Sequence, residues 1–177
     1  MFFAFSFFLA VTHLVPHATD IGFSAVEAAI VLSLTGGATI VGRLLLGTAS
    51  DKIGRKAAAV TCALLHVGAM VWLLWVRDLW MFYLFALAFG FSWGGMGPTM
   101  AALIGDTFGL SRLGAILGVL DAGFNAGAAI GPYIGGLIFD VSRSYSLAFS
   151  LGVAVMLLST LFIALIKRET DRSPDGG

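Results

Sequence analysis

The sequence predicts an all-α integral membrane protein built as a bundle of six transmembrane helices. Three observations carry this prediction. Only 11% of the 177 residues are charged, against about a quarter in soluble domains, and the mean hydropathy is +0.98. Six long apolar runs alternate with short polar segments. The basic residues are concentrated in alternate connections between those runs.

The six apolar runs define the expected spans, since a bilayer core takes about 20 apolar residues per helix. The first run is short and lacks a flanking charge, so we expect a helix whose first turn is missing, and not a signal peptide. The connections are too short for a soluble domain, so neighbouring helices are expected to be antiparallel. The expected transmembrane domain covers residues 1–166, and a polar tail covers 167–177. The runs are residues 1–15, 25–49, 57–76, 79–104, 113–139 and 145–166.

The distribution of basic residues predicts the orientation. The connections after the second and fourth runs, together with the tail, hold seven of them, against two in the other three connections. By the positive-inside rule, both chain ends are expected in the cytoplasm, in a protein of the plasma membrane. The seven are Lys52, Arg55, Lys56, Arg112, Lys167, Arg168 and Arg172, and the two are Arg77 and Arg143.

An internal repeat links the second and fifth runs. GRLLLGTASD (42–51) and GPYIGGLIFD (131–140) share the pattern G-x4-G-x3-D, and each ends the second helix of a triplet. Because three helices separate the two copies, they emerge on opposite sides of the membrane. This predicts two inverted three-helix repeats, at about 1–76 and 79–166, an arrangement found in many secondary transporters.

Polar side chains inside the spans are the candidate pathway residues. Asp121 lies about nine residues into the fifth run, roughly 13 Å from its end, and Asn125 follows one turn later. A charge at this depth costs about 2.5–3.5 kcal/mol on insertion scales, so it should face a cavity or a partner. The alternative for Asp121 is a structural hydrogen bond to a neighbouring helix. Arg43 lies in the second run, where its guanidinium suits a carboxylate, and the alternative is snorkelling to the interface.

Glycine and proline in the fourth run predict close packing and bending. The segment 90–100, GFSWGGMGPTM, includes Gly94, Gly95 and Pro98. Small residues let helices approach, and proline permits a kink. The pattern leaves open whether this segment is a gate beside the pathway or a packing device.

The sequence predicts no enzyme, no cofactor, no metal centre and no nucleic-acid partner. It has no catalytic arrangement with supporting context and no phosphate loop. His13, His17 and Asp20 are too few ligands to define a metal site, so we expect histidines at a helix end. His66 lies among apolar residues and is expected to have a packing role.

The stretch GRLLLGTASDKIGRK (42–56) closely resembles the signature cytoplasmic loop of the major facilitator superfamily. The resemblance implies half of a twelve-helix fold, and a loop whose aspartate and arginine latch one transport state against a counterpart in the other half. Glycine is expected to permit the tight turn, and Ser50 or Asp51 to cap the third helix. The matching residues are Gly47, Asp51, Lys52, Gly54, Arg55 and Lys56.

A finer resemblance is to the C-terminal half of the monocarboxylate and oxalate/formate porter branch. It is carried by residues 12–29, Arg43, residues 131–149 and the polar tail. In that branch an arginine at this place contributes to carboxylate binding. The sequence departs at two positions: Thr39 stands where monocarboxylate porters tend to carry an aspartate, and Phe124 where oxalate porters carry a lysine.

The resemblance implies secondary active transport of a small solute, an organic anion such as a carboxylate, by alternating access. The expected partners are this solute with or without coupled protons, the lipid bilayer, and a second six-helix half or a homodimer mate. Two alternatives stay open. One is a truncated or half-size membrane protein without transport activity of its own, and the other is a drug/proton antiporter half. The antiporter-like motif consists of Gly118, Gly127, Gly131, Pro132, Gly135 and Gly136.

Overall fold

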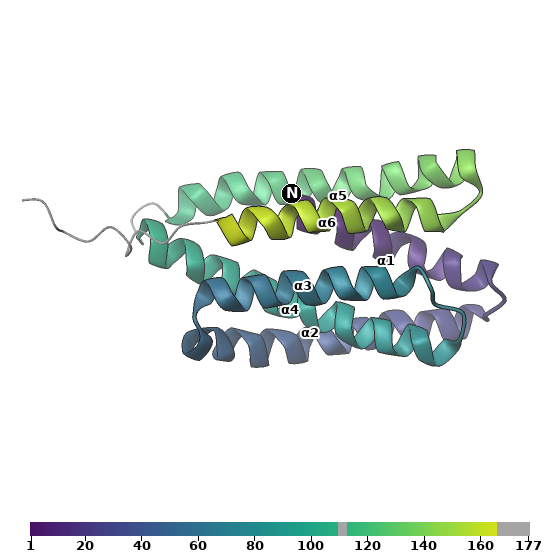
Figure 1. The fold of residues 1–177 in the computed structure, drawn as a ribbon, viewed down its shortest axis with the longest axis horizontal. Coiled ribbons are helices and arrows are strands. Elements are labelled where there is room, and N and C mark those ends of the chain that lie inside the picture. Colours follow the sequence, from purple (N-terminus) through teal and green to yellow (C-terminus); the bar gives the residue numbers. More distant parts are fainter. Residues whose placement is uncertain (110–112, 166–177) are drawn as a thin grey trace, which may run out of the picture.

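The computed structural model describes residues 1–109 and 113–165, which form six α-helices (Figure 1). Each helix is long and apolar enough to cross a membrane, so the predicted number of spans is confirmed. The expected tail, 167–177, lies outside the described residues, as does Arg112 in the fourth connection. The helices are α1 (Phe2–Asp20), α2 (Ala25–Ile53), α3 (Arg55–Leu73), α4 (Leu79–Phe108), α5 (Leu113–Ser142) and α6 (Tyr145–Leu165).

The first helix is longer than its hydropathy suggests. Its apolar run ends at Val15, but α1 continues through Pro16 to Asp20. The hydroxyl of Thr19 donates hydrogen bonds to the carbonyl oxygens of Val15 (3.2 Å) and Pro16 (2.9 Å). These bonds add to the backbone hydrogen bonds that pair the carbonyl groups of the final turn. The last turns are polar and still helical.

The junction between α2 and α3 is a single residue. The sequence predicts a loop over residues 50–56, but only Gly54 separates the two helices, with a φ of 92° that favours glycine. Gly54 is also the N-cap of α3, which has no side-chain cap hydrogen bond. The expectation that Ser50 or Asp51 caps α3 is therefore wrong, because both residues still belong to α2.

The bundle consists of two groups of three helices. Figure 1 shows α1, α5 and α6 on one side and α2, α3 and α4 on the other, with extensive contacts inside each group. Each group thus takes the first helix of one expected repeat and the second and third helices of the other. The most extensive helix contacts are those of α2 with α4 and of α1 with α5. These two pairs correspond to each other in the expected repeat, in which α2 matches α5 and α4 matches α1.

Equivalent glycines lie at these two crossings. A Cβ added at Gly42 of α2 would overlap the main chain of Phe91 in α4, and one at Gly131 of α5 would overlap the main chain of Phe5 in α1. Gly42 and Gly131 are also the first residues of the matched sequence patterns. This correspondence supports the proposal that the halves, at about 1–76 and 79–166, are inverted repeats.

A small network of hydrogen bonds lies inside the apolar core. His66 of α3 is fully buried, with Nδ1 3.1 Å from the Ser92 hydroxyl of α4 and Nε2 3.5 Å from the Ser6 hydroxyl of α1. Ser92 donates its proton to the carbonyl oxygen of Phe89, so its oxygen accepts the proton of Nδ1. His66 therefore joins three helices by hydrogen bonds as well as by packing.

Candidate functional site

A large cavity lies toward the end of the bundle at which α2, α4 and α6 end and α5 begins. It has a volume of about 930 Å³ and is lined by residues of these four helices and of α1. Its wall is mostly apolar and rich in aromatic rings, among them Phe3, Trp93 and Phe124. Binding sites for small molecules are typically clefts of about 300–1,000 Å³ with a few polar groups on an apolar wall.

Two charged side chains line this cavity, Arg43 from α2 and Asp121 from α5. Both are exposed in this chain, which fits the prediction that Asp121 faces a cavity, and Arg43 reaches the same space. Within residues 1–109 and 113–165 both ion pairs belong to Arg55, so neither Arg43 nor Asp121 has an ionic partner within 4.0 Å. The side chains of the cavity wall thus present one cation and one anion to a bound solute.

Asn125 holds the carboxylate of Asp121. Its amide nitrogen donates to Oδ2 of Asp121 at 3.2 Å and to the Asp121 carbonyl oxygen at 2.8 Å. The hydrogen-bond partner of Asp121 therefore lies on its own helix, rather than on the neighbouring helix that the structural alternative requires. The other oxygen, Oδ1, keeps its capacity to accept hydrogen bonds.

Thr39 lies one turn before Arg43 but takes no direct part in the cavity wall. Its hydroxyl donates to the carbonyl oxygen of Thr35 at 2.8 Å. The Thr39 carbonyl oxygen instead packs against Gly94 of α4, where an added Cβ would overlap it and lie 2.9 Å from the Arg43 amide nitrogen. Gly94 therefore fixes the distance between α4 and the turn of α2 that carries Arg43.

The other small residues of α4 complete this crossing. A Cβ at Gly95 would lie 2.6 Å from Cβ of Leu46 and 3.0 Å from Sγ of Cys62, so α2 and α3 both pack closely here. Pro98 lies within α4, and its ring is 3.8 Å from the position of a Cβ on Gly47. The predicted packing segment is thus in contact with the signature loop.

Three glycines of the antiporter-like motif pack α5 closely against α1. They are Gly127, Gly131 and Gly135, the fully buried residues of α5 within the described chain, so the two main chains approach closely at this face. A Cβ at Gly135 would lie 2.7 Å from the imidazole of His13. His13 Nε2 donates to the carbonyl oxygen of Pro132 at 3.0 Å, which makes His13 a bridge between α1 and α5.

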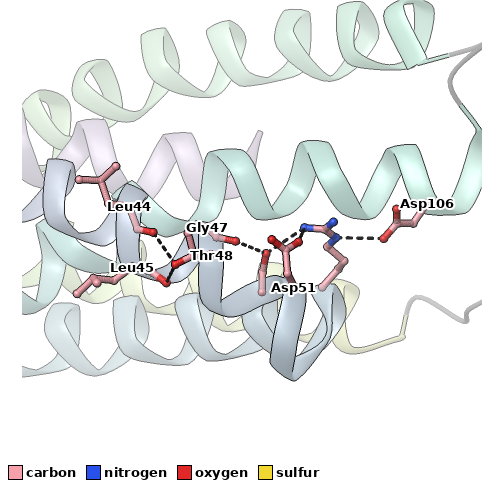
Figure 2. A network of polar contacts seen from close by, with 8 residues as sticks. Leu44, Leu45, Gly47, Thr48, Asp51 and Asp106 are labelled. Atoms are coloured by element: carbon pink, nitrogen blue, oxygen red, sulfur yellow. Dashed lines mark hydrogen bonds and ion pairs between the residues drawn. The ribbon is translucent and has the colours of Figure 1, made fainter.

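The signature residues form an ion-pair network at the junction of α2 and α3 (Figure 2). Arg55 pairs through Nη1 with Asp51, and its Nε donates to Oδ2 of Asp106 in α4 at 3.1 Å. Nη1 also donates to the Ser50 hydroxyl at 3.2 Å, and that hydroxyl donates to the Gly47 carbonyl oxygen at 2.7 Å. The arginine of the signature loop thus has acidic partners within this chain, whereas the resemblance implies a counterpart in another half.

The lysines of the signature loop are not part of this network. Lys52 is exposed and Lys56 is half-buried, and neither forms an ion pair with a described residue. Their charge at this end of the bundle is the feature that predicted its cytoplasmic location.

We expect Asp106→Asn to lower the free energy of unfolding by about 0.2–1 kcal/mol, the usual range for exposed ion pairs. Both partners are partly exposed, at 26% for Arg55 and 58% for Asp106. A double-mutant cycle with Arg55→Gln, measured by thermal unfolding in detergent, should give a coupling that shrinks in high salt. Lys52→Gln is the matched control. A coupling of zero would show that the two groups do not interact.

Two features of this site were missed from sequence. Asp106 lies in the segment 105–112, which the sequence predicts as a connection, although its carboxylate lies at the same end as the basic signature loop. That shared end was the available signal. Trp93 was assigned only to a glycine-rich packing segment, and nothing in the local pattern indicates which way its ring points.

The fold and the signature network together define a membrane protein of the Major Facilitator Superfamily, and the chain belongs to this family. The family model matches residues 1–177, the whole chain. Its members are membrane transporters, not enzymes, so the prediction of no enzyme is confirmed.

Two relatives are similar to the chain over most of its length. It is 30% identical over 159 residues to "Monocarboxylate transporter 12" of Xenopus laevis, covering 88% of this chain and 35% of the relative. It is also 30% identical over 156 residues to "Uncharacterized MFS-type transporter YcxA" of Bacillus subtilis, covering 84% of this chain and 38% of the relative. The chain thus spans about a third of the length of these relatives.

A solved structure shows the same fold. The crystal structure of an auto-inhibited POT family peptide transporter superposes with a TM-score of 0.75, over 92% of this chain and 34% of the other, at 21% identity. At this identity the likeness establishes the fold. The prediction of an all-α bundle within this family is confirmed.

Proposed function

We propose that the protein acts in secondary active transport of a small carboxylate-bearing solute, such as an organic anion, by alternating access. The observation that carries the proposal is Arg43, an arginine without an ionic partner among the described residues, on the wall of a cavity of about 930 Å³. A guanidinium offers a planar fork of donors that matches a carboxylate. The similarity to a protein named as a monocarboxylate transporter supports this solute class.

The pathway requires a second six-helix unit. In this family's twelve-helix plan, two such bundles rock against each other around a central site. The described chain supplies one bundle, whose cavity is bordered by α2 and α5, the helices with the smallest buried share. We propose that the chain corresponds to the C-terminal half, with both ends in the cytoplasm, and that its partner is the other half or a second copy.

Uptake into proteoliposomes tests the proposal. Radiolabelled monocarboxylates are offered to the protein assembled with its second bundle, with and without a pH gradient. Accumulation that follows the gradient supports proton-coupled transport, whereas accumulation that is indifferent to it supports uniport or exchange. Absence of uptake for every carboxylate would refute the proposed function.

Arg43→Lys is expected to reduce carboxylate uptake about tenfold. Lysine keeps the charge but loses the bidentate fork, and tenfold corresponds to one charge-assisted hydrogen bond. Arg77→Lys is the matched control, because Arg77 is exposed in the connection between α3 and α4 and lies outside the cavity. Unchanged uptake by Arg43→Lys would remove the bidentate role.

A further inference from the structure

The wall of the cavity carries two oppositely charged side chains that form no ion pair with each other. Arg43 enters from α2 and Asp121 from α5, and no described carboxylate or cation lies within 4.0 Å of either charged group. A simple carboxylate would satisfy Arg43 but bring a second negative charge into a cavity that already holds Asp121. Repulsion between the solute carboxylate and Asp121 would weaken binding, and would select against solutes that carry only negative charge.

We propose that the solute is a zwitterion, with a carboxylate bound by Arg43, an ammonium bound by Asp121 and an apolar, ring-bearing body. This inference rests on the proposed function, because it takes the carboxylate site at Arg43 as given. It adds a second recognition site and a class of solute, amino acids with aromatic or bulky apolar side chains.

The carboxylate of Asp121 is prepared for such a group. Asn125 donates to Oδ2, which fixes the orientation of the carboxylate, and Oδ1 keeps its capacity to accept. An ammonium carries three donors and no acceptor, so it complements an acceptor-only carboxylate. A second carboxylate from a dianionic solute would instead meet the like charge of Asp121 at this position.

The aromatic wall suits the apolar body. Trp93 lies between the rings of Phe3 and Phe124, with centroids at 5.4 Å and 5.8 Å. Phe7 stacks on Trp93 at 3.6 Å and holds its ring in place. Rings at these spacings provide flat apolar surface for another ring, and their faces also attract an ammonium group.

The test compares three probes that share one aromatic body. L-phenylalanine carries both charges, 3-phenylpropanoate carries only the carboxylate and 2-phenylethylamine carries only the ammonium. Binding to the full chain in nanodiscs is measured by isothermal titration calorimetry. We expect L-phenylalanine to bind about tenfold more tightly than 3-phenylpropanoate, the effect of one charge-assisted hydrogen bond.

Variants at position 121 separate charge from shape. Asp121→Asn should reduce the preference for L-phenylalanine over 3-phenylpropanoate to about one, and Asp121→Glu should retain it. Asp140→Asn is the matched control, since Asp140 is an exposed acid on the same helix outside the cavity, and it should leave the ratio unchanged. Because the readout is a ratio of two ligands on one variant, a partly unfolded sample changes both values alike.

The outcomes distinguish this inference from the proposed function. If 3-phenylpropanoate binds as tightly as L-phenylalanine and depends on Arg43 alone, the zwitterion is refuted while the carboxylate transporter stands. If neither carboxylate binds, the zwitterion is refuted, whereas the proposed function is refuted only by absence of uptake for every carboxylate.

Discussion

Gly94→Ala is expected to lower the free energy of unfolding by about 3 kcal/mol, in the upper part of the range for overpacked interiors. The added methyl group would overlap the Thr39 carbonyl oxygen, which is main chain and has no rotamer to change. Helices α2 and α4 must therefore separate, and the turn that carries Arg43 moves with α2. Thermal unfolding in detergent measures the first effect, and carboxylate binding should weaken in parallel.

Gly105→Ala provides the control for this substitution. Gly105 lies on the same helix, and nothing is within 4 Å of the position that its Cβ would take. The same chemical change should therefore leave the stability unchanged or slightly raised, since alanine favours helix over glycine. Equal effects at the two positions would show that the α2–α4 contact does not limit stability.

Gly131→Ala is the second substitution with a large expected effect, because the main chains of α5 and α1 approach closely at this glycine. The new methyl group would overlap the carbonyl oxygen of Phe5, so α5 must move away from α1. We expect a loss of about 2–3 kcal/mol. Hydrogen exchange should accelerate in α5 while α2 and α4 keep their protection, since the substitution disturbs only the packing of α5 against α1.

Gly114→Ala tests whether this effect belongs to the crossing or to the helix. Gly114 lies at the start of α5, where an added Cβ has no atom within 4 Å. Its exchange profile should match that of the unchanged protein. Acceleration throughout all six helices in Gly131→Ala would contradict a local role and point to a crossing on which the whole bundle depends.

The six spans could be predicted from sequence because hydropathy distinguishes segments that lie in lipid from segments that lie in water. The helix ends could not be predicted in this way, because the helical backbone continues beyond the last apolar residue. Residues 50–52 are polar, which predicts a loop, although their amides remain in the helical hydrogen-bond pattern that continues to Gly54. The same reasoning explains the extra turn of α1 after Val15.

The site could be predicted only one helix at a time. Arg43 and Asp121 are recognisable because a charge inside a span is costly, but their place in one cavity depends on how α2 and α5 are arranged. Asn125 was correctly placed on the face of Asp121 by its spacing of four residues. Asp106 could not be paired with Arg55 from sequence, since the contact crosses between helices.

Because Gly54 alone separates α2 from α3, the distances in the Arg55 ion pairs depend on the angle between these two helices. Asp51 belongs to α2 and Arg55 to α3, so the two charges lie on two helices that are joined only by Gly54. A small rotation of α3 against α2 about Gly54 changes the distance between Arg55 and Asp51 without any change of side-chain rotamer. Spectroscopic probes on these two helices would therefore follow the opening of the network as a change of angle, with Asp106 marking the position of α4.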